Sequence, residues 1–120
     1  MIKIYVTRGS VSASDDVDAP HSKELEISET SSVKEILVEV YKLYPLPKVY
    51  GGKATWSIIS RIPLAVVAQQ WNYLKLLNET PSIEKSELHI SNEVIQIHFN
   101  YHAQIEPDTV FEVLERLRIA

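Results

Sequence analysis

Residues 30–47, "TSSVKEILVEVYKLYPLP", decide the fold class, because they predict one amphipathic helix between segments that favour strands. Ser32 and Glu35 have the spacing of a capping box, which is typical of a helix N-terminus. Apolar side chains then recur at helical spacing, namely Val33, Ile36, Leu37, Val40, Leu43 and Tyr44. The two prolines of "YPLP" cannot continue a helix. We therefore expect a helix over residues 33–44.

Predicted strands lie on both sides of this helix. Residues 2–8, "IKIYVTR", and residues 22–28, "SKELEIS", alternate apolar and polar side chains, as half-buried strands do. Residues 53–60 and 64–71 favour two further strands, because they contain β-branched side chains within short apolar runs. A helix over residues 63–78 is the competing interpretation of the last segment.

The second half predicts a polar connection over residues 78–86, then a hairpin and a final helix. Residues 87–91 and 93–101 alternate on either side of a turn near Ser91–Val94. The apolar face of this hairpin would comprise Leu88, Ile90, Ile95, Ile97, Phe99 and Tyr101. The opposite face would comprise His89, Gln96, His98 and Asn100. The stripe of a helix over residues 106–120 would comprise Val110, Phe111, Leu114 and Leu117.

These elements predict an α+β protein of one domain, residues 1–120, with the order β-β-α-β-β-β-β-α. A run of strands, a helix and more strands favours a mostly antiparallel sheet. The order β-β-α-β-β of the first 71 residues resembles that of β-grasp (ubiquitin-like) proteins.

Composition excludes several kinds of site. The chain has no cysteine, which rules out disulfides and thiolate metal sites. Its first residues, "MIKIYVTRGS", lack the apolar run of a signal peptide. Elsewhere no apolar run approaches the roughly 18 residues of a membrane span. We therefore expect a cytoplasmic domain.

Charge is unevenly distributed along the chain. The net charge is −4, yet residues 15–39 carry −6, residues 40–75 carry +5 and residues 76–120 carry −5. A negative total disfavours a general nucleic-acid binder, which needs a surplus of lysine and arginine. An acidic surface favours a basic protein partner instead.

Three aspartates stand close together in residues 9–20, "GSVSASDDVDAP". A calcium loop is disfavoured because "DDVDAPHSKE" holds no glycine for the turn, and a catalytic pair is disfavoured because no nucleophile or base motif accompanies it. A solvated turn is the simplest interpretation, and an acidic docking surface is the functional one. The expected partner-binding residues are Asp15, Asp16, Asp18, Glu24, Glu26 and Glu29.

The register of the predicted hairpin offers a second candidate site. It places His89 opposite Gln96 and His98 opposite Glu87, so that the two histidines and the glutamate share a face. Such a set can bind zinc or perform acid–base chemistry. A one-residue slip would separate its members, and a polar sheet face is the simpler interpretation.

Aromatic and basic side chains interleave in the middle of the chain. The aromatic residues are Tyr41, Tyr44, Tyr50, Trp56, Trp71 and Tyr73, and the basic ones are Lys42, Lys48, Lys53 and Arg61. Core packing explains most of the rings, but the combination is also typical of a platform for single-stranded nucleic acid. Either the acidic loop or this basic-aromatic middle, Lys42–Lys75, can be the contact surface.

No motif with the spacing of a nucleophile, metal or cofactor site occurs, so we expect a binding protein without a cofactor rather than an enzyme. Through "SASDDVDAP" (12–20) and "ELEISET" (24–30), the chain resembles the small immunity proteins of bacterial toxin–immunity pairs, including contact-dependent growth inhibition systems. The resemblance implies a cognate toxin as partner, often a basic nuclease, whose active site an acidic surface would occlude. A β-grasp-like adaptor and a small metal-binding enzyme that uses His89, His98 and Glu87 are the alternatives.

Overall fold

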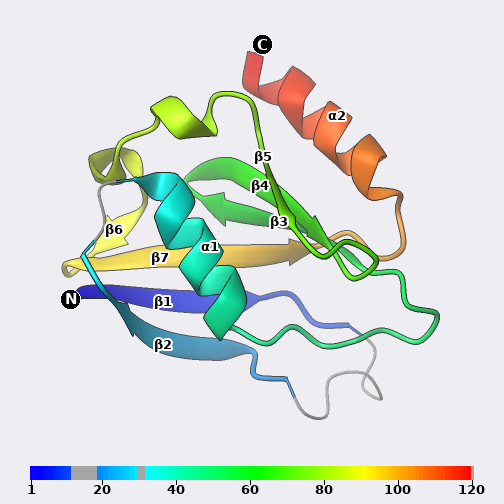
Figure 1. The fold of residues 1–120 in the computed structure, drawn as a ribbon, viewed down its shortest axis with the longest axis horizontal. Coiled ribbons are helices and arrows are strands. Elements are labelled where there is room, and N and C mark those ends of the chain that lie inside the picture. Colours follow the sequence, from blue (N-terminus) through cyan, green and yellow to red (C-terminus); the bar gives the residue numbers. More distant parts are fainter. Residues whose placement is uncertain (12–18, 30–31, 120) are drawn as a thin grey trace.

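The computed structural model describes residues 1–11, 19–29 and 32–119. Residues 118 and 119 are described as backbone only. The strands and α-helices follow one another along the chain in the order β-β-α-β-β-β-β-β-α (Figure 1). The elements are β1 (Ile2–Arg8), β2 (Ser22–Ile27), α1 (Val33–Leu43), β3 (Thr55–Ser60), β4 (Ile62–Ala68), β5 (Leu74–Leu76), the 3-10 turns η1 (Thr80–Ser82) and η2 (Lys85–Glu87), β6 (Ile90–Ser91), β7 (Val94–Tyr101) and α2 (Pro107–Ile119).

The described strands form one sheet in the order β2-β1-β7-β3-β4-β5, with β6 paired to the start of β7. β1 and β7 run parallel, and the other pairs in the described part of the chain are antiparallel. The expected α+β class is therefore confirmed. The two hairpins of the β-β-α-β-β order are not neighbours in space, because β7 lies between them (Figure 1). The first 71 residues therefore do not form a sheet of their own, because β7 from the second half is the parallel partner of β1.

Helix α1 covers one face of the sheet. Its buried residues Ile36, Leu37 and Val40 belong to the same apolar cluster as Ile4 and Ile97 of the two central strands. Burying a side chain of this size contributes about 1.5–3 kcal/mol to the free energy of unfolding. Since side chains alternate along a strand, the residues next to these point to the opposite face of the sheet.

Helix α2 packs against β3 and β4. The residues that lead into α2 are held on the sheet face opposite α1, because the Thr55 hydroxyl donates to the Ile105 carbonyl at 2.6 Å. Residues 64–68 of β4 are all buried, because a helix lies on each face of the sheet. Burial on both faces explains why these residues form an unbroken apolar run. Two polar contacts join α2 to β5 and to the residues that follow β5. Lys75 of β5 pairs with Asp108 at 3.7 Å, and the backbone amide of Asn78 donates to the Glu115 carboxylate.

Three sequence predictions are corrected. The competing helix over 63–78 is wrong, because β4 and the additional short strand β5 occupy that range. The predicted strand over 87–91 shortens to β6, because the 3-10 turn η2 takes up its first residue. Leu117 is 66% exposed rather than part of the stripe of α2, because the C-terminal end of the helix extends beyond the sheet (Figure 1).

No helix in the described part of the chain is both long and apolar enough to span a bilayer.

Candidate functional site

The face of β2, β1 and β7 opposite α1 carries polar side chains and is not covered by α2, which packs against β3 and β4. By register this open face comprises Glu24 and Glu26 of β2, Lys3, Tyr5 and Thr7 of β1, and Gln96, His98 and Asn100 of β7. The predicted division of β7 into a polar and an apolar face is confirmed, since Ile95, Ile97 and Phe99 are buried on the face toward α1. The open face is therefore the main polar surface of the sheet.

Strand β2 is an outer strand of the sheet, and we call it the acidic edge. Glu24 lies opposite Tyr5 and Glu26 lies opposite Lys3, and both carboxylates are exposed. Lys3 forms no ion pair with Glu26 among the described residues. Two of the six predicted docking residues thus lie on the open face, both exposed, with Lys3 opposite one of them.

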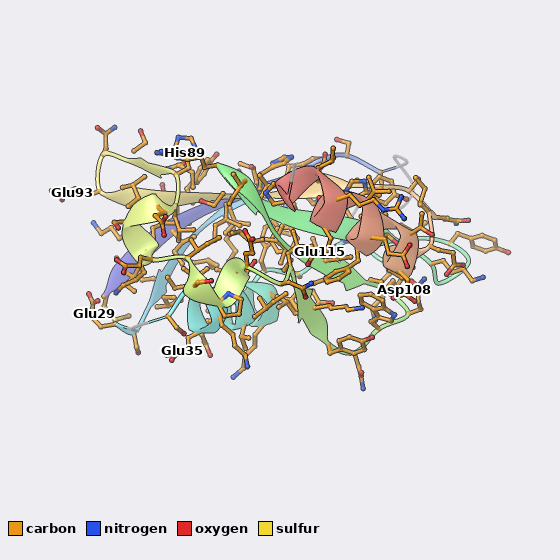
Figure 2. The ribbon with its side chains drawn as sticks, turned by 90° about the horizontal axis from the view of Figure 1, so that it is seen from above. Glu29, Glu35, His89, Glu93, Asp108 and Glu115 are labelled. Atoms are coloured by element: carbon orange, nitrogen blue, oxygen red, sulfur yellow. The ribbon has the colours of Figure 1, made fainter. Side chains whose placement is uncertain are left out.

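Glu29 lies beyond the end of β2, on the same side as α1 (Figure 2). Its carboxylate is 3.7 Å from the amino group of Met1. It lines a hollow of about 530 Å³ between β2 and the first turns of α1, together with Glu35 and Glu39, and Lys34 is the cation of its lining. We call this the acidic hollow. Sequence reasoning missed the two helix residues, although their spacing of four places them on one helix face.

Asp15, Asp16 and Asp18 lie outside the described residues. The residues that follow this segment are held by Arg8, which is 5% exposed. Its guanidinium donates to the carbonyls of Ala19 at 2.9 Å and of Pro20 at 3.0 Å. No sequence signal marked this arginine, because in the pattern of β1 it occupies an inward position usually taken by an apolar residue.

The histidine–glutamate set does not assemble. His89 lies opposite Gln96, as predicted, and the backbone N–H of Gln96 donates to the His89 carbonyl at 2.8 Å. His98, however, lies opposite Ile59 of β3, and Glu87 belongs to η2, where its carboxylate accepts from the Glu84 amide. The hairpin is too short to reach Glu87. Among the described residues no group of three His, Asp or Glu side chains is placed to hold a metal ion.

Two other histidine contacts lie across the sheet. The ring of His98 is 2.7 Å from the Thr7 hydroxyl, and the ring of His102 is 2.8 Å from the Ser57 hydroxyl. Partial burial lowers the pKa of His98 and the pKa of His102, because desolvation disfavours the charged ring. His89 is exposed on the side of the sheet away from α1 and Glu35 (Figure 2). The contacts of His98 and His102 tie neighbouring strands together.

Two hollows share Tyr41 and Lys42 along the C-terminal half of α1. One, of about 610 Å³, lies between the end of α1 and the residues that follow it, and the other, of about 590 Å³, lies between α1 and β5. Their cationic lining residues are Lys23, Lys34, Lys42, Lys48 and Lys75, and no carboxylate lines either hollow. We call the two together the basic groove.

The aromatic residues of the middle segment divide between core and surface. Trp56 and Tyr44 are buried, as core packing predicts. Trp71 and Tyr73 stack with ring centroids 4.9 Å apart, and Tyr73 is 50% exposed beside the groove. Burial raises the pKa of Tyr41. Only part of the sequence-predicted aromatic platform is therefore at the surface.

Comparisons with known proteins give no relative from which a function could be carried over. No family model matches the chain, and neither a curated protein nor a solved structure matches it.

Proposed function

We propose that this chain is a protein-binding module that neutralises a cognate bacterial toxin, in particular a basic nuclease, by covering its active site. The acidic edge and the acidic hollow would be the contact surface. In this role the protein would act in the cytoplasm and would need no cofactor.

One observation carries the proposal: carboxylates border the outer strand of the sheet on both faces. Glu24 and Glu26 line it on the open face, and the acidic hollow lies at its end on the face of α1. Glu24, Glu26 and Glu39 form no ion pair within the described residues. A basic surface that approaches β2 from the edge would therefore meet negative charge along most of the strand.

The backbone of the acidic edge supports a specific mode of binding. An outer strand carries N–H and C=O groups that its single neighbour does not use, and an extended segment of a partner can add to it as a further strand. Lysine or arginine side chains of that segment would then lie directly opposite Glu24 and Glu26. Long-range attraction between the charges would speed the encounter, and the body of the domain would cover the toxin.

The test starts from the tagged protein, expressed in its native host and captured with its partner. We expect a stoichiometric basic protein whose nuclease activity is absent in the complex and returns after separation. Association of the purified partner with E24K/E26K should be slowed more than about tenfold at low salt and less at high salt. The control E106K/E112K makes the same charge change near α2 and should associate normally. A partner without toxic activity, or equal slowing by both variants, would refute the proposal.

The sequence-predicted aspartates require a separate variant, because they lie outside the described residues. D15K/D16K/D18K should also slow association more than about tenfold at low salt. An unchanged association rate would remove this segment from the interface and leave β2 as the contact surface.

A further inference from the structure

We propose that the basic groove along α1 binds single-stranded nucleic acid. Lys34 also lines the acidic hollow and Lys23 belongs to β2, but the other lysines of the groove lie outside the proposed partner-binding surface, and the inference does not depend on that role. The groove concentrates positive charge on a protein whose net charge is −4. Total charge is therefore a poor guide to this part of the surface.

The lysines of the groove are available for an anionic ligand. Lys34, Lys42 and Lys48 are exposed and form no ion pair within the described residues. Lys75 is held in place, because its ammonium lies 4.2 Å from the centre of the Phe111 ring and 3.7 Å from the Asp108 carboxylate. Lys23, the fifth cation, donates to the Leu43 carbonyl at 3.5 Å. Three exposed lysines and two lysines with a partner thus line the groove, and no carboxylate lines it.

All cations of the groove are lysines, which bind phosphate as point charges without the bidentate geometry of arginine. A phosphate chain needs only a succession of positive charges.

The aromatic residues favour a ligand with flat rings. Tyr73 is half exposed, and its ring stacks on the ring of Trp71 with the two ring planes 12° apart. Tyr41 lies between the two hollows. Unpaired bases stack on such side chains at about 1–3 kcal/mol per base, and this stacking is insensitive to sequence. Because a duplex keeps its bases stacked inside, the combination selects single strands.

Fluorescence anisotropy with a labelled oligothymidylate of about 16 nucleotides tests the proposal. We expect saturable binding at low salt that weakens steeply as salt is added. K42E/K48E should lower the affinity at least about tenfold, whereas the matched control K3E/K53E, whose lysines lie outside the groove, should change it less than about twofold. Replacing Lys42 and Lys48 by glutamine should reduce the salt slope by about 1.4.

The stacking part of the proposal has its own pair of variants. Y73A should weaken binding roughly tenfold, and Y73F should bind like the wild type. Since Tyr73 is half exposed, neither change threatens the fold, and circular dichroism checks this. Absence of saturable binding, equal loss in the control double variant, or displacement of the oligonucleotide by an oligoglutamate of equal length at lower concentration would overturn the proposal.

Discussion

The two ends of α1 border surfaces of opposite charge. The acidic hollow lies at its first turns, with Glu35 in the first turn, and the basic groove lies mainly along its C-terminal half, with Lys42 in the last turn. Lys34 and Val38 line both, so the two surfaces adjoin. The helix macrodipole favours the placement of Glu35 and Lys42 by about 0.3–1 kcal/mol per charge. A net charge of −4 describes neither surface.

Both surfaces depend on the packing of the same helix. Leu37 is fully buried in the middle of α1, and L37A should lower the free energy of unfolding by about 2–5 kcal/mol. V38A, at the neighbouring position where the side chain is 44% exposed, should change it by less than about 0.5 kcal/mol. Urea unfolding followed by tryptophan fluorescence measures both. Similar losses would mean that α1 is not seated on the sheet as described.

The C-terminal end of α1 should be the more firmly fixed of the two. Tyr44 follows the helix and donates to the Pro20 carbonyl at 2.8 Å, beside the buried guanidinium of Arg8. R8M would leave the Ala19 carbonyl without this donor and should cost about 2–3 kcal/mol of unfolding free energy. R61M, at an exposed arginine, should cost less than about 0.5 kcal/mol. Equal shifts of the urea midpoint would remove Arg8 from this anchoring role.

The N-terminal end rests on a smaller anchor. The Ser32 hydroxyl accepts a hydrogen bond from the Glu35 amide at 3.2 Å. S32A should lower the free energy of unfolding by about 1 kcal/mol, measured by thermal circular dichroism. S91A, in the exposed strand β6, serves as the control and should be nearly neutral. A loss larger than that of R8M would reverse the ranking of the two ends.

His98 and His102 should make the free energy of unfolding fall slightly as the pH decreases. Burial lowers the pKa of His98 and His102 from 6.5, so the unfolded chain binds more protons than the folded one at mildly acidic pH. The contribution of these neutral rings to stability is present above pH 6.5 and is lost as pH falls through the folded pKa values. Unfolding free energies between about pH 7.5 and 5 should therefore fall less steeply in H98Q/H102Q.

Asn100, an exposed residue of β7 without a titratable group, provides the control for this comparison. N100A should retain the wild-type pH slope. A slope that H98Q/H102Q leaves unchanged would show that other groups cause the acid sensitivity.

Features with local causes could be predicted from the sequence. The cap at Ser32 and the alternation of β7 are examples, since each depends on residues a few positions apart. The hairpin turn is another. Asn92 and Glu93 both have positive φ, 53° and 67°, as the favoured two-residue hairpin turn requires. Such signals identify single elements and short hairpins.

Features with distant causes could not be predicted. Nothing near β7 in sequence indicates that it lies between two other hairpins, and a three-residue strand such as β5 leaves no periodic signal. The basic groove shows the same limit for function. Its Lys23 and Lys34 come from the acidic segment 15–39, so the charge along the chain did not reveal the lining.

The parallel pair at the centre of the sheet has a consequence for folding. Thr7 of β1 and His98 of β7 are in contact although 91 residues separate them. The hairpins β1–β2 and β3–β4 consist of local contacts and can form early, but neither can join the other until β7 is inserted between them. Closing so long a loop has a high entropic cost before any contact offsets it. We therefore expect the arrival of β7 to limit the folding rate of this protein, however quickly its helix and hairpins form.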